Sequence, residues 1–154
     1  MIIIVEFSSK NILKKVKTLP GEKSLEKLLH LLNPRMCKNE FVFCSFKGGG
    51  DFHAYAYLSP EAAIIEDEGI SLVIPKGTAD KYGLKYDTVF KKITLSVYSS
   101  LDSVGLTAAV SGKLAEKGIP ANMIAGFYHD HIFVPVQRAE EALGVLSKIK
   151  AGDL

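Results

Sequence analysis

The second half of the chain has the clearest alternation of hydrophobic and polar positions. Between residues 92 and 98 apolar and polar residues alternate with a period of two, which predicts a half-buried β-strand. Leu106, Val110 and Leu114 then repeat every four residues, which predicts one face of an amphipathic helix. The elements predicted here are a strand at 92–98, a helix at 103–117, strands at 121–128 and 132–136, and a helix at 137–150.

The resulting order is β-α-β-β-α, which places both helices on one face of an antiparallel sheet in a ferredoxin-like arrangement. The sixth element of the full βαββαβ pattern is a strand, and it does not follow residue 150. An unpaired sheet edge exposes backbone hydrogen-bonding groups. We therefore expect that edge to be covered by residues 2–7, by a strand from the first half, or by a partner chain.

The first half has a weaker pattern of the same kind. Four leucines spaced as on one helix face follow Ser24, a residue type that favours the helix N-cap, and Asn33-Pro34 ends the helix. Aromatic and β-branched residues then predict strands, and the residues Asp67-Glu68-Gly69 predict a tight hairpin turn. The predicted elements are a helix at 25–32, a strand at 40–46, a loop at 47–60, strands at 62–66 and 70–75, and a short helix at 78–82.

These patterns divide the chain into three parts and define an α+β fold class. Residues 1–22 are expected to be an N-terminal extension with a β-hairpin, residues 23–90 an atypical ferredoxin-like half, and residues 91–154 a more regular one. Each half is expected to build an antiparallel sheet with its helices on one face.

Composition and charge exclude several classes of protein. With 154 residues and 47% hydrophobic content, the chain can bury a substantial core. Residues 23–154 carry fifteen basic and fifteen acidic groups, a neutral balance that does not favour nucleic acid. The initial apolar run is broken by Glu6, so we expect neither a signal peptide nor a membrane span. Two cysteines, Cys37 and Cys44, are too few for a disulfide framework, so a cytoplasmic location is expected.

Particular residues of the second half resemble the ACT domain family. The relevant stretches are 104–110 (VGLTAAV), 114–119 (LAEKGI), Asn122, Ile124 and 128–135 (YHDHIFVP). They are similar to the tandem ACT modules of aspartokinases and of CASTOR-type arginine sensors. They are most similar to stand-alone bacterial proteins that pair an atypical ACT half with a regular one. The resemblance is specific over residues 91–150, weaker over 36–90, and does not extend to 1–22.

The resemblance implies that a ligand, usually an amino acid, binds between two ACT units. In such families the loop after the first strand and the start of the first helix approach the ligand, opposite the second strand of a neighbouring unit. A helix N-terminus suits a carboxylate because its first N–H groups are unpaired and its end carries partial positive charge. The expected ligand-binding residues are Ser100, Leu101, Asp102, Ser103, Val104, Gly105 and Leu106, with Asn122, Met123 and Ile124 on the facing strand.

Two of these residues have structural alternatives. Gly105 would let the backbone approach a ligand closely, or it would only allow tight packing of the helix. Asp102 would hold a ligand's ammonium group, or it would only cap the helix.

His129 and His131 are the remaining candidates for chemistry. Two histidines separated by one residue share one side of an extended strand, and with Asp130 they could begin a metal site. No third ligand is placed nearby by the sequence, so a polar hairpin turn is the alternative. We therefore expect no metal and no cofactor.

The sequence therefore predicts a regulatory protein that binds a small-molecule effector, with an amino acid as the expected ligand, and is not an enzyme. A homodimer and a protein partner for output are expected, without nucleic acid or membrane. Two alternatives stay open: an oligomeric scaffold without a ligand, and a small metal-dependent enzyme built on His129 and His131.

Overall fold

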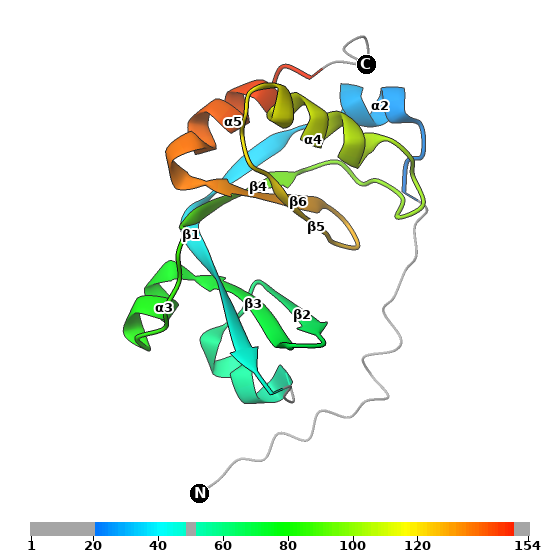
Figure 1. Ribbon diagram of the computed structural model, residues 1–154. Helices are drawn as coiled ribbons and strands as arrows, with labels where there is room; N and C mark the ends of the chain where they lie inside the picture. Colours follow the sequence, from blue (N-terminus) through cyan, green and yellow to red (C-terminus); the bar gives the residue numbers. More distant parts are fainter. Residues whose placement is uncertain (1–20, 49–51, 150–154) are drawn as a thin grey trace, which may run out of the picture.

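The computed structural model describes residues 21–48 and 52–149, so most of the predicted N-terminal hairpin at 1–22 lies outside the described residues. Within these ranges helices and strands follow one another in the predicted order (Figure 1). The helices are α2 (Leu25–His30), α3 (Lys76–Lys81), α4 (Leu106–Glu116) and α5 (Ala139–Leu146), with 3-10 helices η2 (Phe52–Leu58) and η3 (Val136–Arg138). The strands are β1 (Pro34–Lys47), β2 (Ala62–Glu66), β3 (Gly69–Pro75), β4 (Phe90–Leu95), β5 (Asn122–Ala125) and β6 (Asp130–Pro135).

The loop predicted over 47–60 was wrong for residues 52–58, which form η2. Side chains three residues apart lie on one side of a 3-10 helix. Tyr55 and Leu58 accordingly face the same hydrophobic cluster, and Leu58 is fully buried. This spacing differs from the α-helical period of 3.6, so the amphipathic pattern did not reveal the helix.

All six strands form one antiparallel sheet in the order β2-β3-β1-β4-β6-β5. The fourteen-residue strand β1 begins six residues before the predicted start at residue 40. Its later part pairs with β3, and its earlier part pairs with β4 through Pro34–Met36 and Glu40–Phe41. A register shift separates these two stretches, which explains why residues 34–39 show no strand periodicity. Of the three candidates for the missing edge of the second half, the structure shows a strand from the first half.

The two halves share their central strands. In the first half, β1, η2, β2, β3, α3 and β4 form a βαββαβ unit with strand order β2-β3-β1-β4. In the second half, β4, α4, β5, β6, α5 and the earlier part of β1 form the same unit. The pairing registers also correspond, because Phe41 lies opposite Pro75 and Phe90 lies opposite Pro135. We call these units the first and second modules.

Helices cover one face of the sheet. Above the second module, α2, α4 and α5 pack on β4 and β6 around fully buried residues such as Leu28, Ile93 and Leu114. Each such side chain stabilises the fold by about 1.5–3 kcal/mol relative to an exposed one. Helix α2 precedes the first module in sequence, yet its buried residues Leu28 and Leu29 belong to the core of the second. In the first module, η2 and α3 cover a smaller cluster around Leu72.

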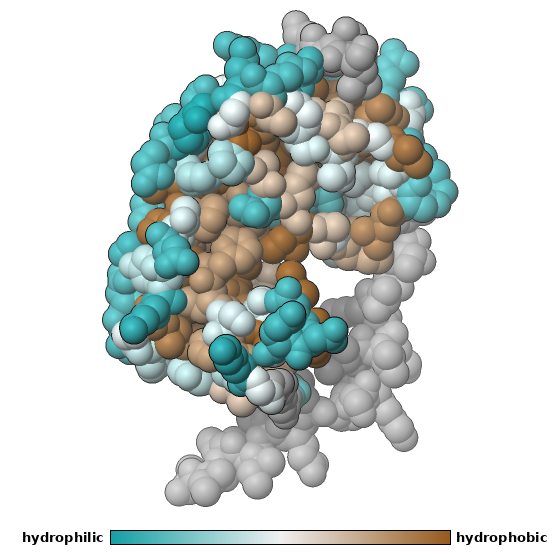
Figure 2. Space-filling model, viewed as in Figure 1, coloured by the Kyte–Doolittle hydropathy of each residue, from teal (hydrophilic) through white to brown (hydrophobic). Residues whose placement is uncertain are grey.

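No helix among the described residues covers the opposite face of the sheet, and this face is concave because the sheet curls. The halves of the curled sheet turn toward each other, and the surface is hollowed between them with hydrophobic residues at its margin (Figures 1 and 2). Rings of Phe41, Phe43, Phe90 and Phe133 meet edge to face here at centroid distances of 5.2–5.7 Å. We call this surface the concave face.

Candidate functional site

The loop between β4 and α4 is held in place by the segment that precedes α2. The amide of Glu22 donates to the carbonyl of Tyr98, and the amide of Ser100 donates to the carbonyl of Glu22, both at 3.0 Å. A Cβ on Gly21 would lie 2.4 Å from the backbone nitrogen of Ser100, so only glycine allows this close approach. The loop that carries the expected ligand residues is therefore fixed by a segment distant in sequence.

The start of α4 differs from the predicted helix at 103–117. The helix begins at Leu106, with Gly105 as its N-cap at φ +103°, and no side chain caps its free N–H groups. A Cβ on Gly105 would lie 2.7 Å from Cδ2 of Leu25 in α2. Close packing against α2 therefore accounts for this glycine, and the first amides of α4 remain without a side-chain acceptor.

Asp102 is not the helix cap. Its carboxylate forms an exposed ion pair with Lys23 at 2.5 Å and accepts a hydrogen bond from the hydroxyl of Ser100. These interactions, with Lys23 first, hold the pKa of Asp102 below its usual value. Hydrogen bonds from the amides of Ser24 and Lys23 likewise lower the pKa of Glu22. Two ionised carboxylates therefore flank the loop.

The loop side chains divide into two groups. Leu101 and Val104 point to solvent, with 67% and 82% of their surfaces exposed, and Ser103 lies between them in a turn closed by its amide and the carbonyl of Ser100. Leu106 is 3% exposed and packs in the core of the second module. Leu101 and Val104 are thus available to a ligand or partner, whereas Leu106 supports the helix.

The expected facing strand is β5, which lies at one edge of the sheet and pairs only with β6. Asn122 and Ile124 face the concave side, and the side chain of Asn122 donates to the carbonyl of Phe133 at 3.3 Å. Met123 faces the opposite way and packs on the core of the second module. The three residues therefore do not present one surface.

No hydrogen bond or ion pair between described residues joins the 100–106 loop to Asn122–Ile124. The near end of the β5–β6 hairpin does contact the loop region, because Tyr128 stacks on Tyr98 at 5.6 Å and His129 Nδ1 lies 3.3 Å from the carbonyl of Val97. Asn122 lies at the far end of β5, opposite Phe133. A site that uses both groups needs the β5 strand of another ACT unit.

A charged group on the concave face was not found from sequence. Lys92, whose side chain is 13% exposed, pairs with Glu61 of the first module and lies 5.4 Å from the ring centroid of Phe41. Lys92 and Glu61 are 31 positions apart in the sequence, so no local motif connects them. The only available signal was a lysine at an inward position of an alternating strand.

His131 lies beside this pair, and its Nδ1 is 3.0 Å from the hydroxyl of Thr94. Burial, and then the charge of Lys92, lower the pKa of His131, so the neutral imidazole is favoured. Burial raises the pKa of the neighbouring Asp130. Within residues 21–48 and 52–149, no three metal-binding side chains come together, and the geometry does not support the metal-dependent alternative.

The cysteines offer no activated nucleophile. Cys44 is buried, and burial raises the pKa of its thiol, which disfavours the reactive thiolate. Cys37 is partly buried and unpaired. In the part of the chain that the structure describes, no helix is long and apolar enough to cross a membrane.

The fold and the paired modules define the class of protein. Two ACT domain models match the chain, one over residues 20–91 and the other over residues 90–148. The chain belongs to the ACT domain family and carries two ACT domains in tandem.

Solved structures agree with this assignment. A Vibrio cholerae protein of unknown function, described as a possible transport protein, is 45% identical with a TM-score of 0.73, and the match covers 82% of this chain and 95% of that one. The ligand-free regulatory subunit of Thermus thermophilus aspartate kinase shares the fold at 10% identity and a TM-score of 0.56, covering 75% and 95%. An Agrobacterium tumefaciens protein does so at 16% identity and a TM-score of 0.60, covering 79% and 89%. No functionally curated protein matches the chain.

Proposed function

We propose that this tandem ACT protein binds an amino acid and transmits that binding to a protein partner. The family and its aspartate kinase neighbours support a regulatory role based on small-molecule binding. The single observation that carries the proposal is the uncapped N-terminus of α4, which lies beside two outward-facing hydrophobic side chains in a loop whose beginning is held by backbone hydrogen bonds to Glu22.

The chemistry of this loop suits a zwitterion. The free amides at the start of α4 would donate hydrogen bonds to the ligand's carboxylate. Asp102 is ionised and exposed, so a ligand ammonium group can replace Lys23 as its partner. Leu101 and Val104 would contact the ligand's side chain. This contact would determine which ligand side chains the site prefers.

A second copy of the chain would complete the site. Among the described strands, β5 pairs with β6 alone and lies at the sheet edge, and sheet edges are the usual feature through which sheets extend between chains. Dimerisation that brings β5 of one copy toward the loop of the other would place Asn122 near the ligand. Ligand binding would then shift the equilibrium between two assemblies, provided that the ligand prefers one of them.

A thermal-shift screen with the twenty amino acids tests the proposal. A ligand present at about 100 times its Kd stabilises a protein by about 2.7 kcal/mol, which raises the Tm of a domain of this size by about 5–10 °C. Val104→Glu should abolish that shift and leave the Tm of the free protein unchanged, because Val104 is exposed. Ile65→Glu is the matched control, since Ile65 is 79% exposed on the first module's edge strand.

A screen without any shift would refute amino-acid binding. The oligomeric scaffold is favoured by one further observation, the exposed Ile64 and Ile65 on β2. If the screen shows no shift and sedimentation gives a dimer that Ile64→Glu dissociates, the scaffold replaces the sensor as the function.

A further inference from the structure

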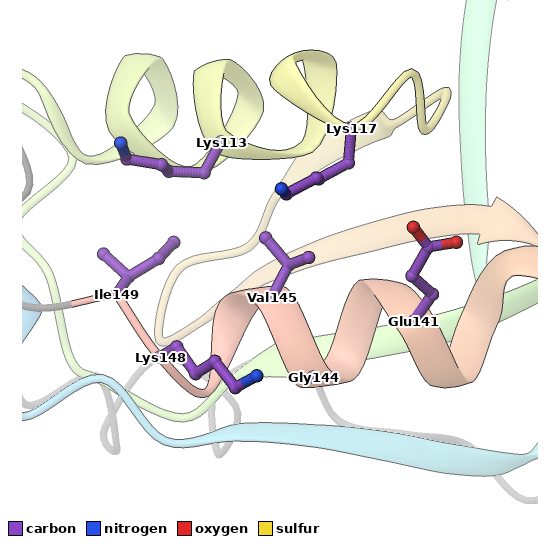
Figure 3. Close-up of a pocket in the computed structure, with 7 residues that line it drawn as sticks. All are labelled: Lys113, Lys117, Glu141, Gly144, Val145, Lys148 and Ile149. Atoms are coloured by element: carbon purple, nitrogen blue, oxygen red, sulfur yellow. The ribbon is translucent and has the colours of Figure 1, made fainter.

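A groove separates α4 and α5 on the outer surface of the second module. It encloses about 640 Å³, within the range of small-molecule binding sites. Lys113 and Lys117 extend from α4, and Val145 and Glu141 rise from α5 toward them (Figure 3). The groove lies on the helical side of the sheet, away from the 100–106 loop and from the concave face, and no role has so far been derived for it.

The groove is positively charged. Its lining includes Lys113, Lys117 and Lys148 but only one acidic residue, Glu141. Arg138 binds Glu141 at 2.7 Å and, with a weaker effect of Lys117, keeps the pKa of that carboxyl low. Lys117 and Lys148 form no ion pair with another described residue. A second copy that presented the same groove would therefore be repelled, whereas an anion would be attracted.

One local feature of the groove is unfavourable for the fold alone. It is not the pair Lys113 and Lys117, because Lys113 also pairs with Glu116 at 3.3 Å. Gly144 lies inside α5, where glycine is less favourable than alanine by about 1 kcal/mol. A Cβ at Gly144 would meet no atom within 4 Å, so packing does not require glycine there. An unfavourable residue without a structural gain is typical of a functional site.

The first module does not leave its helical layer open in this way. There the ring of Tyr57 in η2 meets the ring of Tyr82 at the end of α3, with centroids 5.1 Å apart. Between α4 and α5 no aromatic pair is formed among the described residues, and the glycine keeps the backbone of α5 accessible. The opening is therefore specific to the second module and is not a general consequence of the fold.

We propose that the α4–α5 groove binds a small phosphorylated metabolite. Its phosphate groups would lie between Lys113 and Lys117, and its carbon skeleton would rest on Val145 and the open backbone at Gly144. A phosphate group carries about two negative charges at pH 7, and lysines bind it as point charges. The one nearby arginine, Arg138, is held by Glu141 and by the carbonyls of Lys117 and Gly118. This site is independent of the amino-acid site.

Isothermal titration calorimetry at low salt with ATP, pyrophosphate and citrate tests the proposal. ATP should bind about tenfold more tightly than pyrophosphate, a difference of about 1.4 kcal/mol that reflects its apolar part on the groove floor. Citrate should bind more weakly than either. Lys117→Glu should weaken ATP binding at least about tenfold. Lys81→Glu, which places the same charge change on α3, is the control and should alter affinity less than about twofold.

Filling the groove separates a specific site from general electrostatic attraction. Gly144→Phe keeps every charge, and its Cβ would meet no atom within 4 Å, so it should retain the fold, as a melting curve can check, and still lower ATP affinity. Unchanged affinity in Gly144→Phe, or an equal loss in Lys81→Glu, would overturn the proposal. So would binding to anionic lipid vesicles in the absence of binding to ATP or pyrophosphate. None of these outcomes depends on the response to amino acids.

Discussion

Two glycines in the region of α4 should respond oppositely to the same substitution. Gly105 has a positive φ, which is unfavourable for other residues by about 1–2 kcal/mol, and its new Cβ would approach Cδ2 of Leu25 to 2.7 Å. The end of a leucine can move, so this contact adds about 1 kcal/mol, the low end for overpacking. Gly105→Ala should therefore destabilise by about 2–3 kcal/mol. Gly112 is helical and meets nothing within 4 Å, so Gly112→Ala should stabilise by about 0.5–1 kcal/mol.

Urea unfolding and thermal melting of both variants check this prediction. The Tm should fall by about 4–12 °C in Gly105→Ala and rise by about 1–4 °C in Gly112→Ala, with unchanged m-values. Combining Gly105→Ala with Leu25→Ala should give a loss smaller than the sum of the single losses, because the close contact is removed. A neutral or stabilising Gly105→Ala would refute the explanation of this glycine by packing. A destabilising Gly112→Ala would show that another group lies against that surface.

Three further predictions concern the core, the concave face and pH. Leu28→Ala should destabilise the protein by about 3–5 kcal/mol, because Leu28 is fully buried. Leu31→Ala, at the exposed residue just after α2, should change the stability by less than about 0.5 kcal/mol. Equal effects of the two substitutions in urea unfolding would contradict the packing of α2. Glu61→Gln should destabilise by about 1–3 kcal/mol and adding Lys92→Met should recover most of the loss, as a double-mutant cycle can test. Because the pKa of Asp130 is raised in the folded protein, the contribution of this carboxyl to stability is fully present below its unfolded pKa and is lost as pH rises through its folded pKa. Asp130→Asn should therefore raise the Tm at pH 7 but not at pH 3.

Local patterns predicted the secondary structure well where one helix or strand carried its own signal. The strand at 62–66 has the predicted bounds, and the predicted turn follows it at residues 67 and 68, although Gly69 already belongs to β3. The periodicity of α2 predicted a helix but could not show which core it joins. That depends on contacts such as Leu25 with Gly105, which are 80 residues apart and leave no periodic trace.

The candidate site was predictable only in part for a similar reason. The loop after β4 was identified from its resemblance to ACT domains, and its role in ligand binding stays a prediction. The assignment of Asp102 as a possible cap failed because residue preference does not fix where a helix begins. Glu22 and Lys23 were not singled out, because no sequence motif marks them. Glu22 forms an isolated β-bridge with Ser99, and Lys23 forms an ion pair with Asp102.

The sharing of β1 and β4 has a consequence for how this protein can be divided. A cut between the modules would remove one outer strand from each βαββαβ unit and expose two long edges at once. Neither half should then behave as an autonomous folding unit, and the pair should unfold in a single cooperative transition. Genetic dissection of one ACT domain from the other would therefore report on a damaged fold, so the functions of the two halves are better separated by point substitutions in the intact chain.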